Sequence, residues 1–243
     1  MGSQYDLPPD GRIRVLSASG AVTVIAEERD DVDVEPGQRG VDLKEGGRGR
    51  HRHHRGLLGH LRSHEHGEGE RQHRPVLEVK AKSGNIEVRC PIGTDVSVGA
   101  ISGSVKLKGS FGSVKVSAVS GGVDIDTVTG DLDARAVSGS IAVKRCAGRC
   151  DVSSKSGKVR VERVEGPTHA STISGGVEIG AAGSDEIELK MVSGGAKVTV
   201  LGEKQPRVRF NSLSGKMHCE CKQGSDFDLK VRSISGSLEI KGR

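Results

Sequence analysis

Histidines between residues 44 and 75 are the side chains whose spacing most directly suggests chemistry. Seven of the nine histidines of the chain lie in this segment. The patterns His-x-His-His and His-x-His bring several imidazoles within reach of a single Zn²⁺, Ni²⁺ or Cu²⁺ ion. The candidate metal ligands are His51, His53, His54, His64 and His66.

Arginines of the same segment offer a second interpretation. They alternate with glycine, and such a chain can follow an anionic partner, either the phosphates of a nucleic acid or an acidic membrane surface, with an affinity that falls as salt rises. The candidate anion-binding residues are Arg48, Arg50, Arg52, Arg55 and Arg62. A third interpretation is a disordered loop without a ligand, because the segment has too few apolar residues to fold alone.

Carboxylates that could do acid–base chemistry gather at Asp124, Asp126, Asp131 and Asp133. Lysines stand one repeat before or after two of them, at Lys106, Lys108 and Lys144. We therefore interpret these carboxylates as partners in surface charge pairs, because acid–base catalysis needs a pocket that separates the pKa values of two groups.

The sequence contains no recognisable motif for nucleophilic catalysis. Serines are many, but no Gly-x-Ser-x-Gly elbow, phosphate-binding loop or zinc-helix motif is present. His169 falls in a series with Asp133, Asp151 and Glu188 that indicates charge pairing. The sequence predicts no enzymatic activity, no cofactor and no small-molecule substrate.

Five cysteines, an odd number, favour a reducing compartment. They are Cys90, Cys146, Cys150, Cys219 and Cys221. Three of them, Cys146, Cys150 and Cys219, occupy apolar positions of a repeat described below, where a thiol acts as a small hydrophobic group. Two alternatives stay open: a link between Cys146 and Cys150 across the Ala147-Gly148 turn, and a soft-metal pair at Cys219 and Cys221. Neither has the Cys-x-x-Cys spacing of a zinc site.

All these residues are set in a regular repeat. A Ser-Gly pair returns at every eighteenth position from Ser102-Gly103 to Ser174-Gly175, and weaker marks such as Thr129-Gly130 halve that step. Between marks apolar residues alternate, as in Val123 and Ile125, which is the pattern of a strand with one buried face. Two strands and two turns per repeat predict one coil of a β-solenoid.

The repeat extends beyond its regular part when it is counted back from each serine. Apolar residues stand six, four and one positions before Ser138, at Leu132, Ala134 and Val137, and the same template precedes Ser19, Ser193, Ser214 and Ser235. The later repeats are slightly longer, and their additional residues fall in Gly-, Pro- and charge-rich turns. We expect each coil to stack on the one before it.

Several of these motifs together resemble the bacterial "putative adhesin" family of β-strand-repeat proteins of unknown function. The motifs are Leu7-Pro8-Pro9-Asp10-Gly11, the segment 17–24, the segment 90–98 and the repeated Val-Ser-Gly-x-Val-x-Val units. The resemblance covers nearly the whole chain except residues 44–75. It implies a β-solenoid fold and no known catalytic residues.

Together these patterns predict an all-β, single-domain β-solenoid with two strands in each coil, one coil per repeat. Residues 1–43 hold N-terminal strands and a first coil, residues 44–75 an Arg/His/Gly-rich insertion, and residues 76–243 the body, continuous with 10–43. The start of the chain lacks the apolar run of a signal peptide, and no stretch is apolar enough to span a membrane, so a cytoplasmic location is expected.

A non-enzymatic scaffold or interaction module is the function that this architecture favours. An uncovered last coil at Leu238 and Ile240 would offer unpaired backbone groups to another chain, either a second copy or a different protein. The alternative is a binding protein that uses the segment 44–75 for an anionic partner or a divalent metal.

Overall fold

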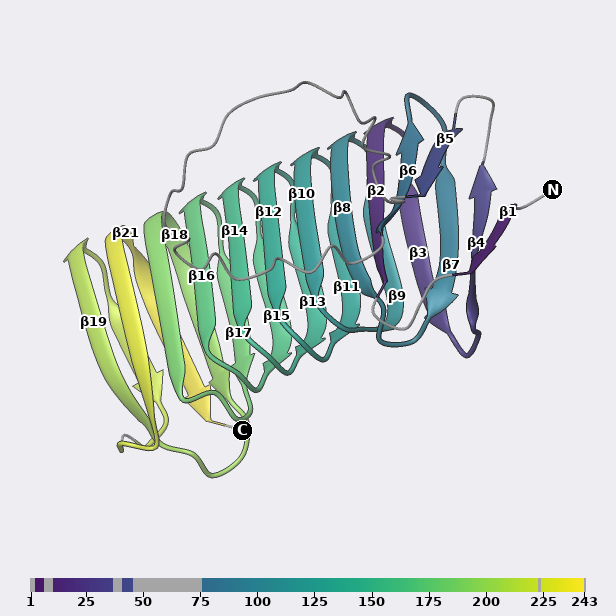
Figure 1. The fold of residues 1–243 in the computed structure, drawn as a ribbon. Helices are drawn as coiled ribbons and strands as arrows, with labels where there is room; N and C mark the ends of the chain where they lie inside the picture. The colour runs from purple at the N-terminus through teal and green to yellow at the C-terminus, as the bar shows by residue number, and fades with distance from the viewer. Residues whose placement is uncertain (1–2, 7–10, 37–40, 46–75, 223, 243) are drawn as a thin grey trace, which may run out of the picture.

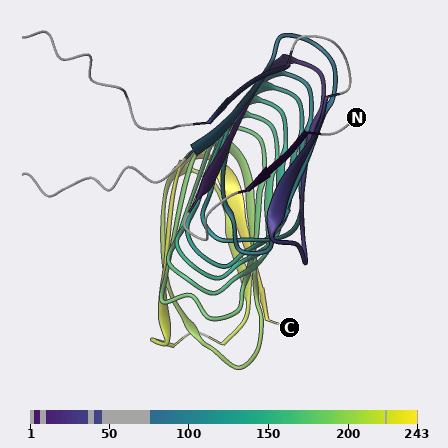
Figure 2. The same cartoon turned by 45° about the vertical axis from the view of Figure 1, so that its right-hand side comes forward.

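A computed structural model describes residues 3–6, 11–36, 41–45, 76–222 and 224–242. Every regular element in these ranges is a β-strand, and the strands stack as coils of a solenoid (Figure 1). Each coil runs up one sheet, turns at a Ser-Gly corner and returns down the other, so that the coils surround an elongated interior (Figure 2). The predicted all-β solenoid is confirmed.

Two rows of parallel strands form the body. The strands before the Ser-Gly corner are, in stacking order, β6 (Val76–Ala81), β2 (Arg12–Ser19), β8 (Asp95–Ser102), β10 (Val114–Ser120), β12 (Leu132–Ser138), β14 (Cys150–Ser156), β16 (Thr168–Ser174), β18 (Glu186–Val200), β21 (Phe227–Gly242) and β19 (Pro206–Ser214). The strands after it are β7 (Ile86–Pro91), β3 (Val22–Glu27), β9 (Val105–Phe111), β11 (Val123–Val128), β13 (Ile141–Cys146), β15 (Val159–Val164), β17 (Val177–Ala181), the second halves of β18 and β21, and β20 (Met217–Glu220).

The coil order differs from the chain order at both ends of the stack. The coil of β2 and β3 lies between those of β6/β7 and β8/β9. At the other end β21 pairs with β18 on one side and with β19 and β20 on the other. The expectation that each coil stacks on the one before it therefore holds for the regular middle and is wrong at the two ends.

Antiparallel strands cover the end of the stack that holds β6 and β7. They are β1 (Ser3–Asp6), β4 (Asp31–Pro36) and β5 (Val41–Glu45). β4 pairs with β7 and β1 with β4, while β5 pairs with β6. Val32 and Val34 of β4 are fully buried. β5 ends at Glu45 and β6 begins at Val76, and the residues between them lie outside the described ranges.

The core is one continuous column of small aliphatic side chains. The strands before the corner, except β19 at the open end, bury alternate residues, as with Leu132, Ala134 and Ala136 in β12. Complete burial of a Val, Leu or Ile side chain contributes about 1.5–3 kcal/mol, so the column stabilises the stack although it contains few aromatic rings.

Outward-facing charges confirm the register inferred from the repeat. Lys106 lies opposite Asp124 in adjacent coils, and Lys144 Nζ is 2.8 Å from an Asp126 carboxylate oxygen. Arg160 and Glu178 also lie opposite each other in adjacent coils, with Arg160 Nε 3.2 Å from a Glu178 carboxylate oxygen. The spacing of the repeat therefore brings opposite charges together across coils, as the sequence predicts.

Candidate functional site: an apolar edge and an open end coil

A row of exposed aliphatic side chains runs along the edge formed by the Ser-Gly corners. Each occupies the position just before the corner serine. The row, in stacking order, is Ile101, Val119, Val137, Ile173, Val192, Ile234 and Leu213, with Lys155 between Val137 and Ile173. Exposed fractions range from 42% at Val192 to 86% at Leu213. We call these aliphatic residues the apolar edge.

The apolar edge corrects the sequence template. The template groups Val137 with Leu132 and Ala134 as one apolar pattern, but Ala136 takes the third buried place and Val137 faces solvent. The reason is the period of two in a strand: positions 132, 134 and 136 share a face, and position 137 lies on the other. The parity of the count back from each serine was the signal that sequence reasoning missed.

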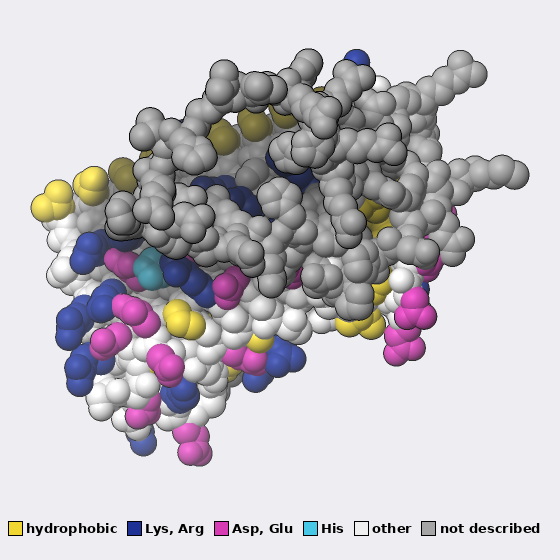
Figure 3. All heavy atoms as spheres, viewed as in Figure 1, with side chains coloured by type: hydrophobic (Ala, Val, Ile, Leu, Met, Phe, Trp, Pro, Cys, Tyr) yellow, Lys and Arg dark blue, Asp and Glu magenta, His cyan; other side chains and the backbone are white. Residues whose placement is uncertain are grey.

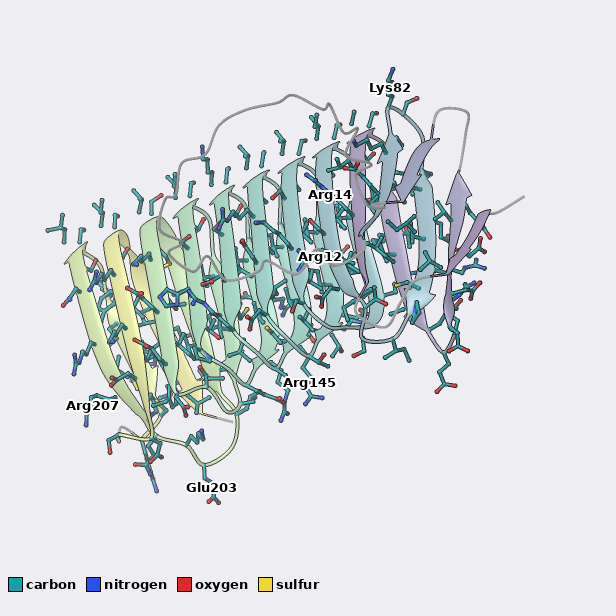
Figure 4. All side chains as sticks on the ribbon, viewed as in Figure 1. Arg12, Arg14, Lys82, Arg145, Glu203 and Arg207 are labelled. Carbon is teal, nitrogen blue, oxygen red and sulfur yellow. The ribbon has the colours of Figure 1, made fainter. Side chains whose placement is uncertain are left out.

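Basic residues surround the apolar edge. Figure 4 shows side chains standing in a row above the upper ends of the strands, with Lys82 at one end. The charged residues in the described corner segments, from three positions before each serine to two after it, are Lys80, Lys82, Arg135, Lys155, Lys158, Lys190, Lys216 and Arg232. Those segments contain no aspartate or glutamate, so the whole described edge has a single sign of charge.

Only some of these cations have a carboxylate partner. Arg135 lies 3.0 Å from Asp133, and Lys190 lies 3.1 Å from Glu188. Lys80 and Lys158 pair with Glu78 and Glu178. The remaining cations of the edge form no ion pair with any described residue. They are Lys82, Lys155, Lys216 and Arg232.

A groove of about 780 Å³ follows the apolar edge over the coils from β10 to β21. Its lining includes the apolar edge from Val119 to Ile234. Serines, the cations Arg135, Lys155, Lys190 and Arg232, and the buried strand positions between them, such as Ala118, complete the lining. Figure 3 shows hydrophobic side chains along the upper margin, over the ends of β19 and β21. The long shape of the groove and its lack of carboxylates suit an elongated ligand or a surface better than a reacting small molecule.

The carboxylate cluster is engaged in surface interactions, as the sequence predicts. Asp126 accepts hydrogen bonds from Lys144 and from the Gly109 N–H at 3.2 Å. Burial, the largest single cause, would raise the pKa of Asp126, but these two hydrogen bonds and the positive charges of Lys144 and Lys108 together lower it. Asp131 accepts the Arg149 N–H, and Asp133 pairs with Arg135. These contacts tie the three carboxylates to neighbouring residues on the surface.

His169 also pairs as its ladder position indicates. Its Nε2 is 2.6 Å from Glu188 and its Nδ1 is 3.9 Å from Asp151. Burial would raise the pKa of Glu188, but a hydrogen bond from Lys190 and the nearby His169 lower it. This arrangement joins three coils by charge.

All five thiols are free. Cys90, Cys146 and Cys150 are completely buried at core positions, and for Cys146 and Cys150 this agrees with their interpretation as small hydrophobic groups. Burial raises the pKa of Cys90 to about 11. Cys219 and Cys221 are half-buried at the end coil, with their Sγ atoms 3.0 Å apart. Burial and then the hydrogen bond with Cys219 raise the pKa of Cys221 to about 11.

The open end of the stack is β19 and β20, and this corrects the position expected for the end-cap interface. Leu238 and Ile240 are 1% and 0% exposed, because β21 is paired on both sides. β19 and β20 pair with β21 alone among the described strands. Their inward residues are less buried than those of other coils: Val208, Phe210 and Cys219 are only partly buried.

The candidate metal and anion ligands of the sequence fall outside the described ranges. These are His51, His53, His54, His64 and His66, with Arg48, Arg50, Arg52, Arg55 and Arg62. Among the residues that the structure describes, no group of three or more His, Cys, Asp or Glu side chains is arranged to hold a metal ion. Nor does this part of the chain contain a helix that is long and apolar enough to cross a membrane.

Comparisons with known proteins gave one family match and one structural likeness. Residues 70–186 match the family model described as Toastrack DUF4097. No curated protein matches the sequence. The chain is also similar to a crystal structure described as a putative cell adhesion protein from Clostridium sporogenes, at 7% identity over 100% of both chains and with a TM-score of 0.28. With a score that low, this likeness carries no argument about the function of the chain.

Proposed function

We propose that this chain, in which residues 70–186 carry a Toastrack DUF4097 domain, is a non-enzymatic β-solenoid scaffold that works in the cytoplasm and associates with a second copy through its open end coil. The family match and the solenoid support the general part of this proposal, an interaction module built from β-strand repeats. The open coil of β19 and β20 supports the specific part.

The unpaired edge of β19 is the observation that carries the proposal. β19 runs from Pro206 to Ser214, and among the described strands it has one neighbour, β21. Its second edge presents backbone N–H and C=O groups to solvent, and such an edge pairs readily with another strand. Phe210 and Val208 lie half-buried below it, so a strand added to this edge would also cover apolar surface.

The two ends of the stack differ, which determines the kind of assembly. At the β6/β7 end the antiparallel strands β4 and β5 interrupt the parallel register. A parallel coil from another molecule has no matching strand there, whereas two β19 edges can meet around a two-fold axis. We therefore expect a closed dimer through like ends rather than an open filament.

Contacts of the described polar groups support a role without catalysis. The carboxylates of Asp126, Asp131 and Asp133 bind lysine, arginine or backbone N–H groups, and His169 is held between Asp151 and Glu188. Three of the five thiols are buried in the core. These groups are used to hold coils together.

Light scattering after size exclusion tests the proposed dimer. We expect a mass of about twice the 25.5 kDa chain that persists at high salt, because strand pairing and apolar contact are not screened. The double change Val208→Lys and Phe210→Lys places inward-pointing charges on the edge strand and should return the mass to that of one chain.

Asn211→Lys is the matched control, because it adds the same kind of charge to β19 at an exposed, outward-facing position. It should leave the dimer intact. Circular dichroism establishes that each variant keeps its strands. A wild-type mass of one chain would overturn the proposal, as would equal loss of the dimer in the variant and the control.

A further inference from the structure

We propose that the apolar edge and its flanking basic residues form a surface that lies on an anionic lipid membrane. The edge is a nearly continuous line of aliphatic side chains that follows the coils from Ile101 to Leu213. At about 4.8 Å per coil the line is roughly 34 Å long. Amphipathic elements that adsorb to bilayers combine these same features, an apolar stripe and flanking Lys and Arg residues.

Charge decides what kind of partner fits this edge. The described corner segments carry lysines and arginines and no carboxylate. Two copies meeting edge to edge would bring cations such as Lys155 and Arg232 against one another, which opposes self-association here. A partner with dense negative charge is favoured instead, and Lys82, Lys155, Lys216 and Arg232 form no ion pair with the described residues that would compete for it.

The aliphatic side chains of the apolar edge favour a membrane over a nucleic acid as the anionic partner. Phosphates of a nucleic acid would engage the cations, but its bases stack on aromatic side chains, and the apolar edge has only Val, Ile and Leu. Those side chains contribute favourable binding free energy only when their apolar surface is removed from water. A bilayer interface supplies both a hydrocarbon boundary for the row and anionic headgroups for the flanking charges.

Geometry also favours a deformable surface over a folded acidic protein. The edge lies at the corners, and its side chains project beyond the ends of the strands (Figure 4). Lipid can close around a narrow projecting row without matching the spacing of the coils, whereas a protein would need a complementary slot. Lysine and arginine stems lie along apolar surface while their charges reach outward to headgroups. The adjacent groove of about 780 Å³ leaves space for lipid atoms beside the apolar edge.

Co-sedimentation of the full chain with vesicles tests the proposal. We expect binding to vesicles rich in phosphatidylglycerol, much weaker binding to pure phosphatidylcholine, and loss of binding as salt rises from about 0.1 M to about 1 M. Replacement of Lys155→Gln with Arg232→Gln should weaken the partition coefficient about 25-fold, at about five-fold for each charge near an anionic surface. Lys106→Gln with Lys108→Gln, on the opposite sheet, removes the same charge and should have little effect.

The apolar contribution needs a variant that leaves charge unchanged. The triple change Val137→Ser, Ile173→Ser and Val192→Ser should weaken binding by at least about 30-fold, because each side chain gives up burial in the interface. Ile92→Ser is its control: Ile92 is 53% exposed but lies at a different turn.

The arginine-rich segment 48–62 could bind vesicles by itself, and the triple variant separates the two sources because it leaves every arginine in place. Undiminished vesicle binding by that variant would overturn the proposal, as would equal binding to neutral and anionic vesicles or the absence of vesicle binding. The vesicle results are independent of the proposed end-coil dimer, because none of these variants changes Val208 or Phe210.

Discussion

Gly139 gives the sharpest test of the stacked corners. Its backbone has φ of +146°, a conformation that side-chain-bearing residues rarely adopt. A methyl group added there would overlap the carbonyl oxygen of Gly121 in the next coil, far inside the 3.4–4 Å of ordinary van der Waals contact. Backbone atoms of a stacked coil cannot rotate away as a side chain would. The change Gly139→Ala should therefore force two coils apart.

The magnitude follows from two costs. A residue held in a sparsely populated backbone region loses about 1–3 kcal/mol. Overpacking in a close-packed region costs about another 1–3 kcal/mol. We expect Gly139→Ala to lower the free energy of unfolding by about 2–6 kcal/mol, measured from urea titrations followed by circular dichroism.

Gly122→Ala is the matched control. Gly122 is next to the stacked Gly121, but an added Cβ meets nothing within 4 Å and its φ lies outside the strained region. Its effect should stay within about 0.5 kcal/mol, as for surface changes away from special features. If Gly139→Ala cost less than about 1 kcal/mol, or no more than Gly122→Ala, the account of the corner as a close-packed backbone stack would be wrong.

Further expected outcomes concern the end coils, ion pairs and thiols. Leu238→Ala should lower the free energy of unfolding by about 2–5 kcal/mol in chemical denaturation, because β21 is internal, while Leu213→Ala on the apolar edge should change it by less than about 0.5 kcal/mol. Hydrogen bonds from Arg145 and Arg163 lower the pKa of Glu165. Its contribution to stability is therefore present above its ordinary pKa of 4.5 and is lost as the pH falls through the lowered value. The melting temperatures of wild type and Glu165→Gln should converge at low pH, and a constant difference would contradict this assignment. A thiol reagent should label at most Cys219 and Cys221 in the folded protein, and Cys90, Cys146 and Cys150 only after unfolding, as peptide mass spectrometry can determine.

Much of the architecture could be predicted because every repeat is subject to the same structural constraints. Each corner needs glycine, each strand alternates, and stacked coils place residues one repeat apart side by side, so the Lys144–Asp126 pair could be inferred from spacing alone. The buried thiols Cys146 and Cys150 were placed by the same template. The template failed where it ignored strand parity, and that is where the apolar edge lies.

Coil order at the ends could not be inferred, because β19 and β21 satisfy one template equally well. Both have inward apolar residues at the same distances before a Ser-Gly corner, and the linking turns are long enough for either order. The contacts of β18 distinguish them in the folded protein. Glu239 of β21 lies opposite Lys197 with their charged atoms 3.7 Å apart, whereas His218 holds the same register position in β20. A small preference of this kind is visible only once the strands are placed.

The insertion of β21 between β18 and β19 has a consequence for synthesis on the ribosome. β19 and β20 leave the exit tunnel before β21, yet β21 is the only described strand with which they pair. A nascent chain that ends near residue 222 therefore has a finished stack up to β18 and a coil without a docking place. β19, which carries Val208 and Phe210, and β20 must remain undocked until β21 is translated, and this exposes them to chaperones or to neighbouring chains. Synthesis of β21 then allows two coils to close in one step, so that a premature stop in β21 would leave both coils unformed.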